Sequence, residues 1–220
     1  MIGDDEQIKK DVVEQLYWDD RVDASGINVT VADRKVELNG TVPSSSARTA
    51  AWNDAIVIPG VASVENNLAV AYPEHLPRVE DAEIKARVYS IFEWDAEIDP
   101  AEITVDAVEG EVTLDGSVDS YWKRRKAEVI AAGIRGVTRV INNLAVTPTE
   151  AVTDKLIAED IAASLARALE NVSRYVNVEV KDGTVTLSGI APDRHQYRTM
   201  LAIASYTPGV TGVIDNLSIA

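Results

Sequence analysis

The feature that most constrains this chain is an internal repeat of two motifs. Each motif occurs three times, and the copies are separated first by 76 and then by 73 residues, as the glycines Gly40, Gly116 and Gly189 show. The first motif reads VELNG, VTLDG and VTLSG and ends at Gly40, Gly116 and Gly189. The second reads VENNLAV, VINNLAV and VIDNLSI and ends at Val70, Val146 and Ile219. Three copies, over residues 5–71, 81–147 and 153–220, fill nearly all of the 220 residues, so we expect three similar domains in tandem.

Each copy opens with apolar residues at helical spacing, such as Ile8, Val12 and Leu16. Two alternating apolar segments follow and predict strands joined by a short turn, which in the third copy is the strong hairpin signal Asp182-Gly183. A second helical segment and a third strand close the copy. The corresponding positions of the first helix are Ile84, Val88 and Phe92 in the second copy and Ile157, Ile161 and Leu165 in the third.

The second helix of each copy is bounded by polar residues and glycines. We expect N-caps at Ser44, Ser120 and Asp193, and left-handed C-caps at Gly60, Gly136 and Gly209. The connection between the second and third strands is long enough for a crossover, so these strands should be parallel, beside an antiparallel hairpin. The predicted fold class is α+β: three tandem α-β-β-α-β domains, each a three-stranded mixed sheet covered by two helices on one face.

Composition excludes several functional classes. The chain has 36 acidic and 21 basic residues, and a net charge of −15 should repel nucleic acid. It has no cysteine, which excludes disulfides and thiolate metal sites, and no apolar run approaches the roughly 20 residues of a transmembrane helix. The first residues, 1–6, lack the pattern of a secretory signal, so we expect a cytoplasmic protein as written, or a periplasmic one if the sequence is a trimmed mature form.

The order of the elements, the strand-end glycine and the closing pattern Gly-Val-x-x-Val-x-Asn-x-Leu-x-Val resemble the BON (bacterial OsmY and nodulation) domain family. Two first helices also end in an aromatic–acid pattern seen in this family, around Trp18-Asp19 and Trp94-Asp95, whereas Arg167 replaces the tryptophan in the third copy. The resemblance implies a binding protein without enzymatic activity or a cofactor. It also implies attachment to phospholipid or to the cell envelope, and a role in osmotic stress.

A basic and aromatic segment at the start of the second helix of copy two is the strongest local candidate for a binding site. It consists of Tyr121, Trp122, Lys123, Arg124, Arg125 and Lys126. Four cations beside two amphipathic rings suit an anionic phospholipid, an envelope component or an acidic protein client. The alternative is a solvated helix face whose cations pair with the protein's own acids. Trp18 and Trp94 either pack over the end of the hairpin or form a membrane or partner surface.

Residues that carry catalysis or bind metals are scarce in this sequence. His75 and His195 are its only two histidines, and they are too isolated to form a proton relay or a zinc site. Asp19, Asp20 and Asp23 could share a hard cation, but they lack the regular spacing of a dedicated loop. We therefore expect no enzymatic activity, no metal and no cofactor.

Two other repeated features have a structural and a functional interpretation. Gly40 and its equivalents lack the context of a phosphate-binding loop, so they indicate a positive φ or a close approach of a helix at the strand end. Asn66 falls on the apparent core face of the last strand, where it should bond neighbouring backbone; a ligand-binding amide is the alternative.

The leading functional interpretation is reversible attachment to phospholipid or envelope surfaces in a stress-protective role. The alternative is a soluble protein-binding or chaperone-like module that uses exposed strand edges and tryptophan surfaces.

Overall fold

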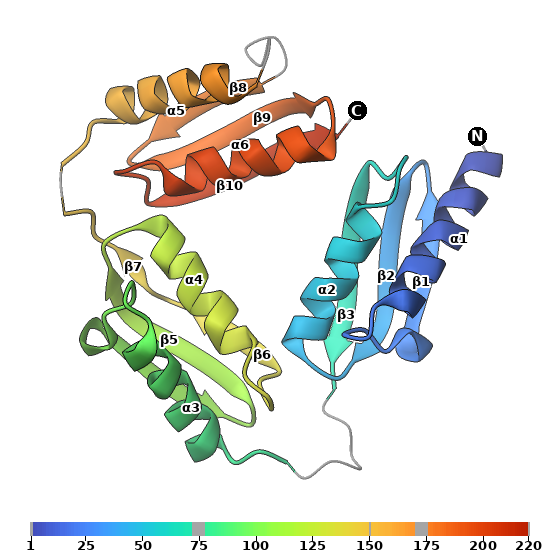
Figure 1. Ribbon diagram of the computed structural model, residues 1–220, viewed down its shortest axis with the longest axis horizontal. Coiled ribbons are helices and arrows are strands. Elements are labelled where there is room, and N and C mark those ends of the chain that lie inside the picture. Colours follow the sequence, from blue (N-terminus) through green and yellow to red (C-terminus); the bar gives the residue numbers. More distant parts are fainter. Residues whose placement is uncertain (1, 72–77, 150, 170–175, 220) are drawn as a thin grey trace. The chain divides into compact units, whose positions relative to one another are not determined.

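The computed structural model describes residues 2–71, 78–149, 151–169 and 176–219, and Figure 1 shows three repeats of one α-β-β-α-β unit. The expected fold class is therefore confirmed. The first repeat contains α1 (Ile2–Trp18), β1 (Ile27–Ala32), β2 (Lys35–Val42), α2 (Ser45–Ile56) and β3 (Ser63–Val70). The second contains α3 (Asp81–Trp94), β4 (Ile103–Val108), β5 (Glu111–Val118), α4 (Tyr121–Ala132), β6 (Arg139–Asn142) and β7 (Ala145–Val146). The third contains α5 (Asp154–Ala168), β8 (Val176–Lys181), β9 (Thr184–Ala191), α6 (Arg194–Tyr206) and β10 (Gly212–Ile219).

The sheet of each repeat is mixed, as the long crossover predicts. In the first repeat β2 lies between β1, to which it is antiparallel, and β3, to which it is parallel. The third repeat has the same order, with β9 between β8 and β10. In the second repeat the last strand is interrupted at Asn143 and Leu144, and both of its parts, β6 and β7, pair with β5.

The core of each repeat lies between the sheet and its two helices. The three apolar positions predicted on each first helix are all buried, and Val12, Val88 and Ile161 are 0% exposed. A fully buried side chain of this size stabilises the fold by roughly 1.5–3 kcal/mol. The helical spacing in the sequence therefore identifies the face of α1, α3 and α5 that packs on the sheet.

A feature that the sequence analysis missed joins each first helix to the turn of its hairpin. Asp5, Asp81 and Asp154 occupy equivalent positions near the helix N-termini, and each carboxylate accepts hydrogen bonds from two successive backbone N–H groups of the turn. The turn residues have positive φ, for example 51° at Asp182 and 74° at Gly183. Such a turn points both N–H groups outward, and the helix supplies their acceptor.

The strand-end glycines are structural. Gly40, Gly116 and Gly189 have φ values of 124°, 121° and 131°, a region that residues with a Cβ rarely occupy. A Cβ on Gly116 would lie 2.1 Å from the carbonyl oxygen of Glu102, the residue before the neighbouring strand β4. The positive φ is thus confirmed at all three glycines, and at Gly116 the close approach is made by the last residue of a short 3-10 helix, Pro100–Glu102.

The predicted C-termini of the second helices are wrong. Helices α2, α4 and α6 end at Ile56, Ala132 and Tyr206, three or four residues before the glycines that we expected to cap them. Those glycines do have positive φ, but they lie in the turn after the helix. At Gly209 a Cβ would lie 2.8 Å from that of Val152, so this turn needs glycine because it packs against the start of the repeat.

Candidate functional site

The ends of α1 and α3 expose tryptophan at equivalent positions. The Trp18 side chain is 74% exposed and that of Trp94 is 88% exposed. Tyr17 is 72% exposed, and its ring meets Trp18 edge-on with the centroids 5.5 Å apart. The interpretation that these tryptophans pack over the hairpin is therefore wrong, and both are surface aromatics.

The aspartate that follows each tryptophan explains where the helix ends. Asp19 Oδ1 accepts a 2.9 Å hydrogen bond from the backbone N–H of Arg21, and Asp95 Oδ1 accepts a 2.9 Å bond from that of Glu97. This local bond turns the backbone away from the helix and leaves the preceding indole at its last position. In the third repeat Ala168 replaces the aspartate, and α5 includes this residue. The aromatic–acid pattern thus marks the last residue of α1 and α3, whereas α5, which lacks the pattern, ends one residue later.

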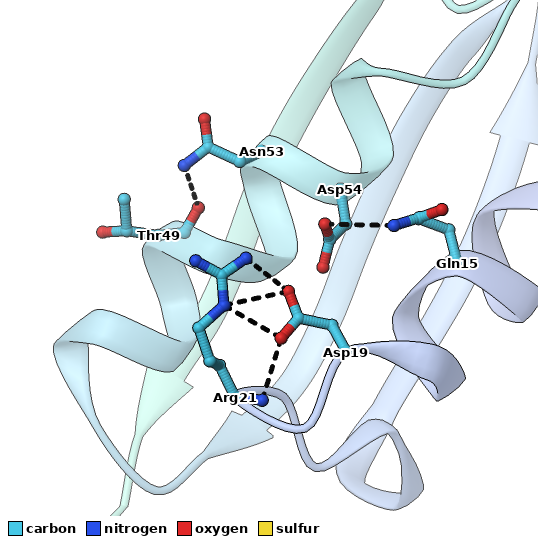
Figure 2. Close-up of polar contacts among 6 residues, drawn as sticks. All are labelled: Gln15, Asp19, Arg21, Thr49, Asn53 and Asp54. Carbon is cyan, nitrogen blue, oxygen red and sulfur yellow. Dashed lines mark hydrogen bonds and ion pairs between the residues drawn. The ribbon is translucent and has the colours of Figure 1, made fainter.

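A carboxylate pair lies beside the end of α1 (Figure 2). Asp19 forms a 2.5 Å ion pair with Arg21, whose hydrogen bonds hold the pKa of Asp19 well below its usual range. Asp54, on α2, is only 6% exposed, and Gln15 Nε2 donates to its Oδ1 over 3.5 Å. Within the described part of the chain its Oδ2 has no hydrogen-bond partner. Burial and the nearby Asp19 carboxylate raise the pKa of Asp54 to about 6.

Asp54 was not singled out in the sequence, although one signal could have identified it. It lies three and four residues after Ala51 and Ala50, on the side of α2 that those alanines bury. A carboxylate at the apolar spacing of a helix is a candidate for a raised pKa.

The acid beside Trp94 is balanced by a different element. Lys126 of α4 lies 2.7 Å from Asp95 and 2.5 Å from Glu97. The hydrogen bond to Asp95 is the main cause of a raised pKa at Lys126, and the same bond lowers the pKa of Asp95. Lys126 therefore ties the start of α4 to the segment after α3.

The basic segment Tyr121–Lys126 forms the first turns of α4, and its cations are not all available to a ligand. Besides Lys126, Lys123 is bonded to Asp119 over 2.7 Å and lies 5.7 Å from the centre of the Trp122 ring. Arg125 is exposed, and Arg124 and Trp122 are half-buried. For both lysines, the pairing with the protein's own acids that we considered as an alternative is what the structure shows.

The repeated amide in the last strand bonds to its own repeat. Asn66 Nδ2 donates to the carbonyl oxygen of Arg48 over 2.9 Å, and its Oδ1 accepts from the backbone N–H of Leu68 over 3.2 Å. The equivalent Asp215 accepts from the backbone N–H of Leu217 over 3.0 Å. The backbone-bonding interpretation of Asn66 is confirmed.

The other predicted features give no ligand site in the parts that the structure describes. Two of the three aspartates near the end of α1 are engaged locally: Asp19 with Arg21, and Asp23, which accepts hydrogen bonds from Ser25. Across the four described ranges, acidic and histidine side chains nowhere gather in a group of three or more that could hold a metal ion. His195 is exposed on α6, and His75 lies outside the described residues. Over the same ranges, every helix is too short or too polar to cross a membrane.

Comparison with known proteins places these features in a family. The BON domain matches residues 4–72, 80–148 and 153–220. The chain is 30% identical over 154 residues to the osmotically-inducible protein Y of Escherichia coli, covering 63% of this chain and 72% of the relative. It is 34% identical over 120 residues to an uncharacterized protein from the gshII 5′ region of Anaplasma centrale, covering 52% of this chain and 80% of the relative.

One solved structure, of the type III secretion protein CdsD of Chlamydia trachomatis, is 13% identical with a TM-score of 0.28, over 97% of this chain and 92% of that one. The three matched segments together span most of the sequence. The chain therefore belongs to the BON domain family and is a triple-BON protein similar to osmotically-inducible protein Y.

Proposed function

We propose that this protein attaches reversibly to phospholipid or cell-envelope surfaces during stress, through the exposed ends of α1 and α3. The observation that carries the proposal is the exposure of Trp18 and Trp94 at equivalent positions of two repeats. Indole combines a large apolar ring with one N–H donor, so it is suited to the boundary between headgroups and acyl chains. The proposed activity is binding without catalysis.

The net charge of −15 would oppose contact with an anionic surface, but the acid next to each tryptophan is neutralised by a nearby cation. Asp19 is bonded to Arg21, and Asp95 is bonded to Lys126. Salt screens charges beyond about 8–10 Å, so more distant acids contribute little repulsion. The aromatic contact should therefore depend little on the charge of the lipid.

The basic segment Tyr121–Lys126 is a second proposed contact, for an anionic phospholipid or an acidic partner. Its support is the density of positive charge at the start of one helix, where exposed backbone N–H groups add a weak preference for anions. Because Lys123 and Lys126 already bond acids, we expect this segment to contribute less than four free cations would.

The proposal requires a compartment in which the chain meets phospholipid. The cytoplasmic face of a membrane and the periplasm both meet this requirement.

Vesicle flotation tests the two contacts separately. The full chain would be mixed with vesicles of phosphatidylcholine, or of phosphatidylcholine with phosphatidylglycerol, at low and high salt. The Trp18→Ala/Trp94→Ala variant should lose at least about tenfold in partitioning to both vesicles. Arg167→Ala changes the equivalent position of the third repeat and should leave partitioning unchanged.

Replacing all four cations of the basic segment with glutamine should weaken only binding to the anionic vesicles, and most at low salt. If the tryptophan variant floats as well as the parent protein, attachment through the helix ends is wrong. If the parent protein floats with neither vesicle, the soluble protein-binding function becomes the better proposal.

A further inference from the structure

One position on the first helix differs among the three repeats and controls a groove beside the sheet. Val13 on α1 is equivalent to Tyr89 on α3 and to Ala162 on α5. Tyr89 and Ala162 face the first strand of their repeat, which lies at the edge of its sheet. A difference here changes the surface between helix and strand without changing the fold.

In the second repeat the protein fills this groove with its own tyrosine. The backbone N–H of Val105 in β4 donates a 3.0 Å hydrogen bond to the hydroxyl of Tyr89. The strand residues beneath, Ile103 and Val105, are 3% and 0% exposed. A phenol ring therefore fits between helix and edge strand, with its hydroxyl at an N–H group that points away from the sheet.

Among the residues of the third repeat that the structure describes, none fills the same groove. Ala162 replaces the tyrosine, and Val176 and Val178, equivalent to Ile103 and Val105, are only half-buried. The cavity between α5 and β8 has a volume of about 330 Å³. Its apolar lining consists of Ala158, Ala162, Leu165, Ala166, Val176 and Val178. An apolar cavity of about 150 Å³ already accommodates a benzene-sized ring, so a phenol has room here.

The edge of β8 presents the same donor as the edge of β4. The pairing of Lys181 with Thr184 closes the hairpin, and Val178 lies three residues before Lys181 on the same strand. Hydrogen-bonded and outward-facing positions alternate in an antiparallel pair, so the N–H group of Val178 faces outward, as that of Val105 does.

The charges around the groove indicate what accompanies the ring. Among the residues that the structure describes, Glu159 is the one charged side chain of its lining. Lys155 lies 3.7 Å from Glu159 but is 84% exposed, so it compensates only weakly. With Glu159 at the groove and a net charge of −15 on the whole chain, electrostatic attraction favours a neutral ring flanked by basic residues.

We infer that the groove between α5 and β8 binds the side chain of a tyrosine that a partner polypeptide supplies next to lysine or arginine. The ring contacts Ala162 and Val178, and its hydroxyl accepts a hydrogen bond from the Val178 N–H, as Tyr89 does in the second repeat. This site is separate from the tryptophans of the proposed membrane contact, and it does not depend on that function.

Peptide titration of the full chain tests the inference by amide NMR. The probe Lys-Tyr-Lys, blocked at both ends, should shift the amides of Val176 and Val178, while Glu-Tyr-Glu should bind more weakly at low salt. Lys-Phe-Lys lacks the hydroxyl and should bind about 2- to 10-fold more weakly than Lys-Tyr-Lys, the range that one neutral hydrogen bond supplies.

Three variants supply the controls. Ala162→Tyr should fill the groove, abolish the peptide-induced shifts and slow hydrogen exchange at Val178, whereas Ala163→Tyr, on the neighbouring exposed position, should do none of these. Tyr89→Ala should open a second site, seen as new shifts at Val105. The inference is overturned if Lys-Tyr-Lys leaves Val176 and Val178 unshifted, or if Ala162→Tyr binds it as the parent protein does. If hydrogen exchange at Val178 were unchanged in Ala162→Tyr, the tyrosine hydroxyl would not bond the Val178 N–H as Tyr89 bonds that of Val105.

Discussion

Asp154, at the N-terminus of α5, accepts a 2.8 Å hydrogen bond from the backbone N–H of Gly183, 29 residues away in the β8–β9 turn. Its other carboxylate oxygen accepts a 2.8 Å bond from the N–H of Asp182. Asp5 and Asp81 make the same pair of bonds in the other repeats. One carboxylate thus joins the first helix of a repeat to its hairpin.

Asp154→Asn should destabilise the third repeat by about 1–2 kcal/mol, because the amide offers one acceptor and turns a donor towards a backbone N–H. Hydrogen exchange of the β8 and β9 amides in the full chain measures the effect. Asp160→Asn removes the same charge from an exposed position of α5 and should change exchange much less. Equal effects of the two variants would show that charge, and not the turn, is responsible.

Gly116→Ala should destabilise the second repeat by more than about 2 kcal/mol. The residue has a φ of 121°, and a Cβ would lie 2.1 Å from the carbonyl oxygen of Glu102. Gly133→Ala is the matched control, because a Cβ there meets no described atom closer than 3.4 Å. Exchange rates of the β5 amides compare the two variants, and similar rates would refute the close-approach argument.

The stability of the first repeat should depend on pH mainly through the titration of Asp54. Its pKa is raised to about 6 in the folded protein, so its stabilising contribution is complete below the unfolded value of 3.8 and is lost as the pH rises through 6. The pKa of Asp19 is lowered, so the stabilising contribution of this group acts in the opposite sense and is lost only in more acidic solution. Between pH 7 and pH 5 the first repeat should therefore gain about 1–2 kcal/mol.

Asp54→Asn should abolish this gain, whereas Asp20→Asn, at an exposed neighbouring position, should keep it. Hydrogen exchange of the α2 amides, corrected for the intrinsic effect of pH, measures both. A gain that persists in Asp54→Asn would assign the titration to another group.

Lys126→Gln should lower the stability of the second repeat, because it removes ion pairs to Asp95 and Glu97 that join two elements. The loss should shrink at high salt, which screens such pairs. Lys155→Gln removes a 3.7 Å pair within one helix and should have a smaller effect. Thermal unfolding of both variants at two salt concentrations checks this, and equal shifts in midpoint would contradict the expected difference.

The sequence by itself determined the repeat, the order of the elements, the buried face of each first helix and the need for glycine at the strand ends. These features depend on local information: the spacing of apolar residues such as Ile84, Val88 and Phe92 follows the helical period, and Gly116 follows from the restricted φ of other residues. The C-termini of the second helices were misplaced because positive φ at Gly209 serves a later turn.

Tertiary structure alone decided which of the polar and aromatic residues are exposed, buried or paired. Trp18 and Trp52 are the same residue type on neighbouring helices, yet one is exposed and the other half-buried. Asp54 has a raised pKa because it is buried and lies near Asp19, and Lys126 is bonded only because Asp95 and Glu97 approach it from 31 and 29 residues away. The sequence determines which charged and aromatic side chains are present. The energies of their interactions depend on distance and solvent access, which are set by the packing of the chain.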